Sequence, residues 1–144
     1  MTPPLMDLPC FSANLRRAER AVGRLYGSEI RKSGLAPTQF TLLMALSRLD
    51  EVTQGELAER LAIDSTTLTR TLGRLEEQGW VASRPGDDRR ERWVRLTLQG
   101  RCRLEAALSH WETAQARLRK ELGDESWSLL LERLVEVTRA AEAA

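Results

Sequence analysis

Hydrophobic residues recur at steps of three and four along much of this chain, and that spacing is typical of amphipathic helices. The first such pattern spans residues 11–30, and its helix is expected to end at Gly34. Residues 39–49 are apolar on most sides and follow Pro37, a residue that favours the first turn of a helix. We therefore predict an amphipathic helix followed by a buried one. Residues 1–9 hold three prolines and no periodic pattern, so we expect a loose arm there.

Two shorter helices joined by a tight turn are predicted next. The first begins at Thr53 in a Thr-x-x-Glu capping box, in which two side chains satisfy free backbone N–H groups, and it ends near Ala62. Asp64 and Ser65 supply the N-cap of the second helix, which carries three regularly spaced leucines and stops at Gly79. A capped helix, a short turn and a second helix have the proportions of a helix-turn-helix.

The hydrophobic period then changes to the two-residue alternation of strands. Residues 80–84 and 92–97 alternate in this way, and the Pro-Gly-Asp-Asp sequence at 85–88 between them has turn chemistry. These features predict a β-hairpin directly after the helix-turn-helix, where it would form a wing.

Two further helices are predicted at the C-terminal end. A long helix opens at Thr97 or Gln99 and stops at Gly123, and a last helix follows. Residues 11–33 hold six basic and two acidic side chains, whereas residues 121–144 hold six acidic and two basic ones. Opposite charge would let the terminal helices pair, either within one subunit or across a dimer.

Composition and charge exclude several classes of protein. A chain of 144 residues with 42% hydrophobic residues suits one domain with a real core. Its net charge of +1 gives no strong overall field. The longest stretch without a charged residue is shorter than the roughly 20 residues that a membrane helix needs. The N-terminus lacks the basic start and apolar core of a signal peptide, so we expect a cytoplasmic protein that does not enter a membrane.

Catalytic and metal-binding patterns are equally scarce. Cys10 and Cys102 form neither a disulfide framework nor a Cys-x-x-Cys pair for zinc. With His110 as the single histidine, the sequence supports neither a metal site built from histidines nor a Ser-His-Asp triad. The sequence also has no glycine-rich phosphate loop. We expect no metal, no cofactor and no enzymatic activity.

The second helix of the helix-turn-helix carries side chains suited to DNA. When its leucines face the core, the hydroxyl side chains of its N-terminal turn and the arginines beyond them face outward, where they can contact DNA. Short hydroxyls approach phosphates without crowding, helix amides favour the phosphate charge, and Arg70 can reach a guanine edge. Capping is an equal alternative for Ser65 and the favoured one for Thr67, while Arg74 suits a phosphate or solvent better than a base. The candidate DNA-binding residues here are Ser65, Thr66, Thr67, Thr69, Arg70 and Arg74.

The predicted wing is rich in arginine, with five arginines against three carboxylates between residues 84 and 95. A narrow minor groove concentrates negative potential and attracts such side chains. A solvated charged loop is the alternative, but a hairpin beside a recognition helix has a groove to enter. The candidate DNA-binding residues of the wing are Arg84, Asp88, Arg89, Arg90 and Arg92.

Several motifs occur in a specific order along the chain. They are Leu-Ala-Pro-Thr-Gln-Phe at 35–40, Gln-Gly-Glu-Leu-Ala-Glu-Arg-Leu at 54–61, Asp-Ser-Thr-Thr-Leu-Thr-Arg at 64–70, Leu-Glu-Glu-Gln-Gly at 75–79, Asp-Arg-Arg at 88–90 and Val-Arg-Leu-Thr-Leu-Gln-Gly at 94–100. In this order they resemble the MarR family of winged-helix regulators over nearly the whole length. The resemblance implies a mainly α, single-domain fold over 1–144: a winged helix-turn-helix DNA-binding lobe at 36–98 with a β-hairpin wing, and N- and C-terminal dimerisation helices at 11–35 and 99–144.

The same resemblance implies a function. Members are homodimers, often repressors, that bind a pseudo-palindromic operator in double-stranded DNA. The recognition helix enters the major groove and the wing enters the minor groove. Carried over to this chain, Arg90 would enter the minor groove and Asp88 would brace it. A winged helix that binds another protein is the competing interpretation, although such a face more often exposes apolar anchors than arginines.

A small-molecule or redox signal is also implied. Members often respond to small aromatic acids held between the dimer helices and the DNA-binding lobe, although ordinary core packing is the favoured interpretation of the aromatic residues. Cys10 begins the first helix, where helix amides promote a reactive thiolate. It is similar to the cysteine of the redox-sensing branch, but that cysteine falls about two residues later, at Ser12, so an inert Cys10 is favoured. We expect Cys102 to be a small buried hydrophobic residue. The candidate pocket residues are Arg16, Arg20, Tyr26, Phe40, Met44 and Trp111.

Overall fold

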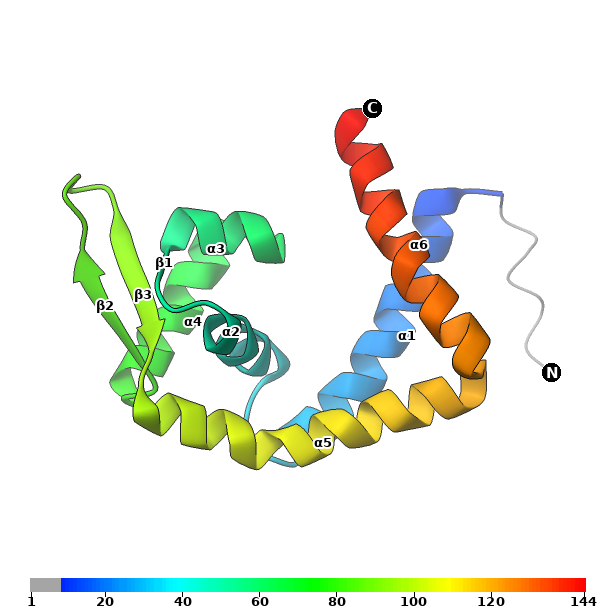
Figure 1. The fold of residues 1–144 in the computed structure, drawn as a ribbon, viewed down its shortest axis with the longest axis horizontal. Coiled ribbons are helices and arrows are strands. Elements are labelled where there is room, and N and C mark those ends of the chain that lie inside the picture. The colour runs from blue at the N-terminus through cyan, green and yellow to red at the C-terminus, as the bar shows by residue number, and fades with distance from the viewer. Residues whose placement is uncertain (1–8) are drawn as a thin grey trace.

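Six helices and three short strands make up residues 9–144, the part of the chain that the computed structural model describes. The predicted arm therefore lies outside the described residues except for its last position. In chain order the elements are α1 (Phe11–Arg31), α2 (Pro37–Arg48), β1 (Val52–Thr53), α3 (Gln54–Leu61), α4 (Ser65–Glu77), β2 (Val81–Pro85), β3 (Arg92–Leu96), α5 (Leu98–Leu122) and α6 (Asp124–Ala143). Figure 1 shows a lobe formed by α2 through β3, and α5 runs from the base of this lobe to α1 and α6.

Local capping sets the ends of the two helices in the predicted helix-turn-helix. Thr53 accepts a hydrogen bond from the backbone N–H of Glu56 at 3.2 Å, as expected for the capping box. Ala62 then ends α3 in the left-handed conformation, with φ of 51°. The cap of α4 is Asp64 alone, because Ser65 is already the first residue of the helix. The capping role weighed for Ser65 is thus wrong.

The hairpin belongs to a three-stranded antiparallel sheet with strand order β1-β3-β2. Its two long strands lie at 81–85 and 92–96, within one residue of the prediction. The sequence analysis missed β1, in which Val52 pairs with Val94 and Thr53 with Trp93. Two residues are too few to show an alternating pattern, so only the partner strand reveals this one.

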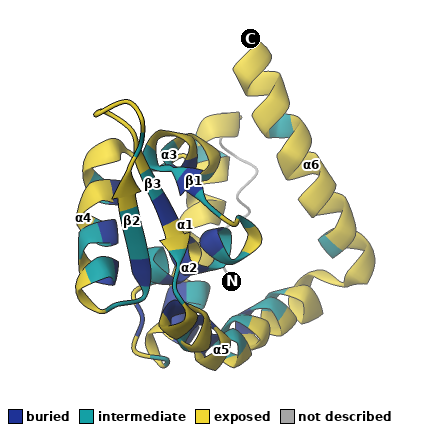
Figure 2. Ribbon diagram, turned by 60° about the vertical axis from the view of Figure 1, so that its left-hand side comes forward, coloured by how far each residue is buried: buried dark blue, intermediate teal, exposed yellow. Residues whose placement is uncertain are grey.

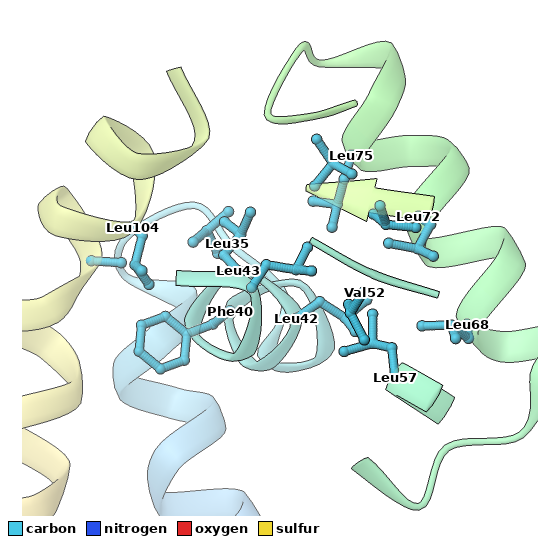
Figure 3. Packing of buried hydrophobic residues seen from close by; sticks show 14 of the residues in the cluster. Leu35, Phe40, Leu42, Leu43, Val52, Leu57, Leu68, Leu72, Leu75 and Leu104 are labelled. Carbon is cyan, nitrogen blue, oxygen red and sulfur yellow. The ribbon is translucent and has the colours of Figure 1, made fainter. Parts of the chain in front are cut away.

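The hydrophobic core lies between α2 and the elements around it (Figure 3). Leu42, Leu43 and Leu46 of α2 have no exposed surface, which confirms that this helix is buried on several sides. Helices α3 and α4 contribute the expected leucines, and the strands contribute valines from their inner face. The buried residues of these elements are Val52, Leu57, Leu68, Leu72, Leu75, Val81 and Val94.

Helix α1 is held against α5 by a buried charge and one hydrogen bond. The carboxylate of Glu29 accepts hydrogen bonds from Lys32 Nζ at 2.9 Å and Arg117 Nη1 at 3.0 Å. The Lys32 hydrogen bond, and after it the Arg117 hydrogen bond and both positive charges, lower the pKa of Glu29 despite its burial. The hydroxyl of Tyr26 on α1 donates to the side-chain oxygen of Gln115 on α5.

Helix α6 has no buried residue within a single chain, and Figure 2 shows it projecting away from the lobe. Leu130, Leu131 and Leu134 of this helix are 44–52% exposed. Leu122 at the end of α5 is also exposed. A soluble chain seldom leaves so many neighbouring leucines open to water, so this apolar face needs a covering surface.

Candidate nucleic-acid interface and ligand pocket

The outer face of α4 carries the first group of predicted DNA-binding residues. Ser65, Thr66, Thr69 and Arg70 line one shallow depression of the surface. Arg74 is also exposed, one turn beyond Arg70. This face is open because the leucines of α4 point to the core, so the side chains of Ser65, Thr66 and Thr69 are exposed at its N-terminal part.

Thr67 differs from the other hydroxyl residues of α4. Its backbone N–H and its hydroxyl both donate to the carboxylate of Asp64, at 2.8 Å and 2.7 Å. These two hydrogen bonds, the hydroxyl first, lower the pKa of Asp64. Thr67 is half-buried and completes the cap, in line with the favoured interpretation of this residue.

The tip of the wing presents arginines to solvent. Gly86 donates its N–H to the carbonyl of Glu91 at 2.9 Å, which closes the loop between β2 and β3. Arg89, Arg90 and Arg92 are exposed, and no ion pair to them occurs within residues 9–144. Three guanidinium groups on one protruding hairpin therefore remain available for phosphates or a groove.

Asp88 and Arg84 have roles inside the wing. Asp88 accepts a hydrogen bond from the backbone N–H of Arg90 at 3.0 Å, so it shapes the loop, and it makes no ion pair with the Arg90 guanidinium in the described structure. Arg84 is paired with Glu51 at 2.5 Å and lies over the ring of Trp93. Hydrogen bonding to Arg84 lowers the pKa of Glu51, and the Arg84 guanidinium gains in basicity from the same contact.

A pocket of about 290 Å³ lies where α1, α2 and α5 meet, with the end of α3 at its edge. It brings together Tyr26, Phe40, Met44 and Trp111, which the sequence analysis grouped. Helical periodicity could have added lining residues that share a helix face with Tyr26 on α1 or Met44 on α2. It could not have added Leu61, which lies on α3. The remaining lining residues are Ile30, Pro37, Thr41, Ala45 and Leu61.

Arg16 and Arg20 do not line this pocket, so the structure does not bring them together with the other four residues, and their part in an effector site stays a prediction. They precede Tyr26 on α1 by ten and six residues, which is about 15 and 9 Å along a helix that rises 1.5 Å per residue. Both are exposed.

The pocket lining is almost entirely apolar. None of its residues carries a formal charge at neutral pH. The hydroxyl proton of Tyr26 is used by Gln115, and that of Thr41 by the carbonyl of Pro37 at 3.0 Å. Burial raises the pKa of Tyr26, so its hydroxyl stays neutral. The pocket therefore lacks a counter-ion for an acid.

The cysteines lie far apart in the fold. Cys10 is the N-cap residue of α1 and is exposed. Cys102 is exposed as well, so the expectation of a buried residue is wrong. Gly100, Leu104 and Ala107 form the inward face of this part of α5, and position 102 lies outside that face. Exposure of Cys10 does not decide between a redox role and the favoured inert one, so the inert Cys10 stays a prediction.

Residues 9–144 contain neither a metal-binding cluster nor a membrane-spanning helix. No group of three or more histidine, cysteine or carboxylate side chains is arranged so that it could hold a metal ion. No helix in this range is long and apolar enough to cross a membrane.

Comparison with known proteins identifies the family. The MarR family model matches residues 33–91. YwoH of Bacillus subtilis, an uncharacterized HTH-type transcriptional regulator, is 35% identical over 83 residues, which are 58% of this chain and 61% of YwoH. This chain thus spans less than two thirds of that relative.

Solved structures extend the similarity to nearly the whole chain. The M. tuberculosis transcriptional regulator MosR in complex with DNA is 36% identical, with a TM-score of 0.80 over 93% of this chain and 97% of MosR. A cysteine-to-serine mutant of MarR from E. coli, complexed with operator DNA, is 26% identical, with a TM-score of 0.77 over 88% of this chain and 91% of MarR. The mainly α, winged helix-turn-helix fold is thereby confirmed, and the chain belongs to the MarR family of DNA-binding transcriptional regulators, which are not enzymes.

Proposed function

We propose that this protein is a homodimeric repressor that binds a pseudo-palindromic operator, with α4 in the major groove and the wing in the minor groove. The observation that carries this proposal is the open face of α4, with its hydroxyls and Arg70, followed in the chain by a wing with three unpaired arginines. MosR and MarR, whose structures contain DNA, are similar over most of their length. Half-sites would lie about one helical turn, roughly 10 base pairs, apart.

The proposed contacts fall into two groups: some recognise bases, and others contact phosphates or hold the protein backbone in place. Arg70 reads a guanine edge, and Ser65, Thr66 and Thr69 contact phosphates or base edges at the start of α4. Arg90 enters the minor groove. Arg74, Arg89 and Arg92 contact phosphates, while Thr67 and Asp88 hold the backbone that presents the others.

The dimer in this proposal covers the exposed apolar face of α6. Phe11 and Leu15 of α1 and Leu130, Leu134 and Val137 of α6 line one apolar groove. A second copy supplies matching leucines, and the basic α1 and acidic α6 attract each other. Residues 11–35 and 99–144 thus form the dimerisation part, and 36–98 the DNA-binding lobe.

DNA binding is tested with a duplex selected by the wild-type protein from a random-sequence library. Fluorescence anisotropy against this duplex and a scrambled one gives Kd across a salt series. We expect tight, specific binding that falls log-linearly with salt, because phosphate neutralisation releases counter-ions. Weak binding that is equal on both duplexes would favour the protein-interaction module instead.

Two variants test the residue assignments. Arg90→Ala should weaken binding to most sequences and reduce the salt slope by about one. Arg70→Ala should lose about 1–3 kcal/mol and relax the base preference at one position of each half-site. Arg139→Ala, which removes an exposed arginine from α6, is the matched control. If Arg70→Ala and Arg90→Ala both bind like wild type, the interface is assigned wrongly.

The effector in this proposal is a small, neutral aromatic molecule bound in the pocket between α1, α2 and α5. A carboxylate there would be buried without a cation, at a cost of several kcal/mol. About 290 Å³ is at the small end of ligand sites and suits one or two rings. Such a ligand changes DNA affinity if it prefers one of two conformations of the dimer.

Ligand class is tested with two probes of nearly the same shape, 2-naphthol and 2-naphthoate. A ligand that binds the folded state raises its melting temperature, so only naphthol should shift it. Ala45→Leu, which fills part of the pocket, should abolish the shift. Tighter binding of naphthoate, or a naphthol shift that survives in Ala45→Leu, would refute the assignment.

A further inference from the structure

Arg84 on β2 contacts Glu51 in the loop before β1 and Trp93 on β3. Its Nη2 lies 2.5 Å from Oε1 of Glu51, and its Nε lies 3.1 and 3.2 Å from the two carboxylate oxygens. The guanidinium also lies 5.4 Å from the centre of the Trp93 ring, within the range of a cation–π contact. We call Glu51, Arg84 and Trp93 the wing clasp.

The strand register explains why these three side chains meet. Trp93 is opposite Arg84 on β2 and opposite Thr53 on β1, and residues directly opposite in an antiparallel pair share one face of the sheet. Glu51 precedes Thr53 by two residues and so falls on the same side, whereas Val94 points to the core. Thr53 is also the N-cap of α3. The clasp therefore ties the wing to the segment that begins the helix-turn-helix.

The wing loop itself rests on the same tryptophan. A Cβ on Gly86 would lie 3.0 Å from Nε1 of Trp93 and 2.7 Å from Cβ of Glu91. The loop thus passes close to the edge of the indole ring, and the missing side chain permits this approach. Trp93 contacts Arg84 and also supports the turn that presents Arg89 and Arg90.

We propose that the wing clasp fixes the orientation of the wing relative to α4, and that Glu51 and Arg84 are positioning residues for DNA binding. Arg84 then does not contact DNA, unlike the other arginines of the wing. Its guanidinium is already satisfied by a carboxylate with two oxygens, and a phosphate would have to displace this partner. The inference rests on the proposed wing–DNA contact.

Two possible roles of Arg84 predict opposite effects of Glu51→Gln on DNA affinity. If the clasp positions the wing, Glu51→Gln weakens DNA binding, because the wing loses its fixed orientation. If Arg84 is a phosphate contact restrained by Glu51, Glu51→Gln tightens binding, because it releases a cation and removes a negative charge near DNA. Arg84→Gln likewise leaves the salt slope unchanged in the first case and lowers it by about one in the second.

The experiment measures Kd on the selected duplex, across a salt series, for the full-length dimer. We expect Glu51→Gln to weaken binding on the order of five-fold in the wild type and less than about two-fold in an Arg90→Ala background, since the clasp acts through the wing. Glu56→Gln is the matched control, because it removes the same charge from the lobe and breaks an exposed pair with Arg60 that does not touch the wing.

A second measurement reports on the wing without DNA. The N–H groups of Gly86 and Glu91 are hydrogen-bonded within the wing, at 2.9 Å each. Their amide hydrogen exchange should become faster in Glu51→Gln and stay unchanged in Glu56→Gln. Unchanged exchange and unchanged or tighter DNA binding in Glu51→Gln would overturn the clasp. If the wild type binds no duplex, or if Arg90→Ala binds as well as wild type, the proposed function fails instead.

Discussion

Gly100, at the third position of α5, is the residue whose replacement should test the packing of the lobe most directly. It is buried, and a Cβ built on it would lie 2.0 Å from the carbonyl oxygen of Trp80 and 2.7 Å from Cδ1 of Leu96. The carbonyl cannot rotate away freely, because it accepts a hydrogen bond from the N–H of Thr97 at 3.1 Å. Gly100→Ala must therefore move the backbone where α4, the wing and α5 meet.

The size of the effect follows from three contributions. Forcing a methyl group into a filled site costs about 1–3 kcal/mol. Losing or stretching the hydrogen bond between Thr97 and Trp80 adds about 1–3 kcal/mol if either group stays buried and unpaired. Alanine offsets about 0.5–1 kcal/mol of this, because it is a better helix former than glycine. We expect Gly100→Ala to lower the free energy of unfolding by about 3 kcal/mol.

The matched control is Gly73→Ala in the middle of α4, where a Cβ would meet no atom within 4 Å. That variant should be more stable than wild type by about 0.5–1 kcal/mol. Urea denaturation followed by circular dichroism measures both variants, at one protein concentration because a dimer's stability depends on it. A Gly100→Ala variant as stable as Gly73→Ala would show that the junction can relax and that the steric argument is wrong.

Three further variants test other parts of the structure. Leu43→Ala should lower the unfolding free energy by about 2–5 kcal/mol because Leu43 has no exposed surface, whereas Leu98→Ala, at a position that is 79% exposed, should change it by less than about 0.5 kcal/mol in urea denaturation. Lys32 and Arg117 lower the pKa of Glu29 in the folded protein below its ordinary value of 4.5. The ionised Glu29 therefore stabilises the fold at pH values above 4.5, and this stabilisation is lost as the pH falls through the lower pKa of the folded state. The stability difference between wild type and Glu29→Gln should accordingly be largest at neutral pH and shrink in acid, and a difference independent of pH would contradict this. Leu134→Asp should shift the protein from dimer to monomer in sedimentation experiments, because it buries a charge in the proposed interface, and an unchanged dimer would refute that interface.

Local sequence rules predicted the DNA-binding lobe well because its elements are set by neighbours in the chain. Thr53 caps α3 through a residue three positions on, and Asp64 caps α4 in the same way. The Pro-Gly turn and the alternation around it placed both strands of the hairpin within one residue. Each cap joins residues three positions apart, and the two strands of the hairpin follow one another in the chain.

The errors concern contacts between distant parts of the chain. β1 exists because β3 pairs with it some forty residues later, and Leu61 reaches the pocket from another helix. Helical spacing placed Arg16 and Arg20 on the same helix as Tyr26, but they do not line the pocket around Tyr26 in the single chain. The apolar residues of α6 have the spacing of a helix that packs against a neighbour, but none of its residues is buried in the single chain. Helical spacing predicts an apolar face and does not specify its partner.

Arg84 shows why charge and position within a motif do not establish a role. In sequence it is one of five arginines of a basic wing, and nothing distinguishes it from Arg90 or Arg92. Its partner Glu51 lies 33 residues earlier, in the loop between α2 and β1. The strand register brings the two together, because Trp93 on β3 is paired with Arg84 on β2 and with Thr53 on β1, and Glu51 lies just before β1. Arginines with a carboxylate partner in the fold should therefore be separated from unpaired ones before any of them is assigned to DNA.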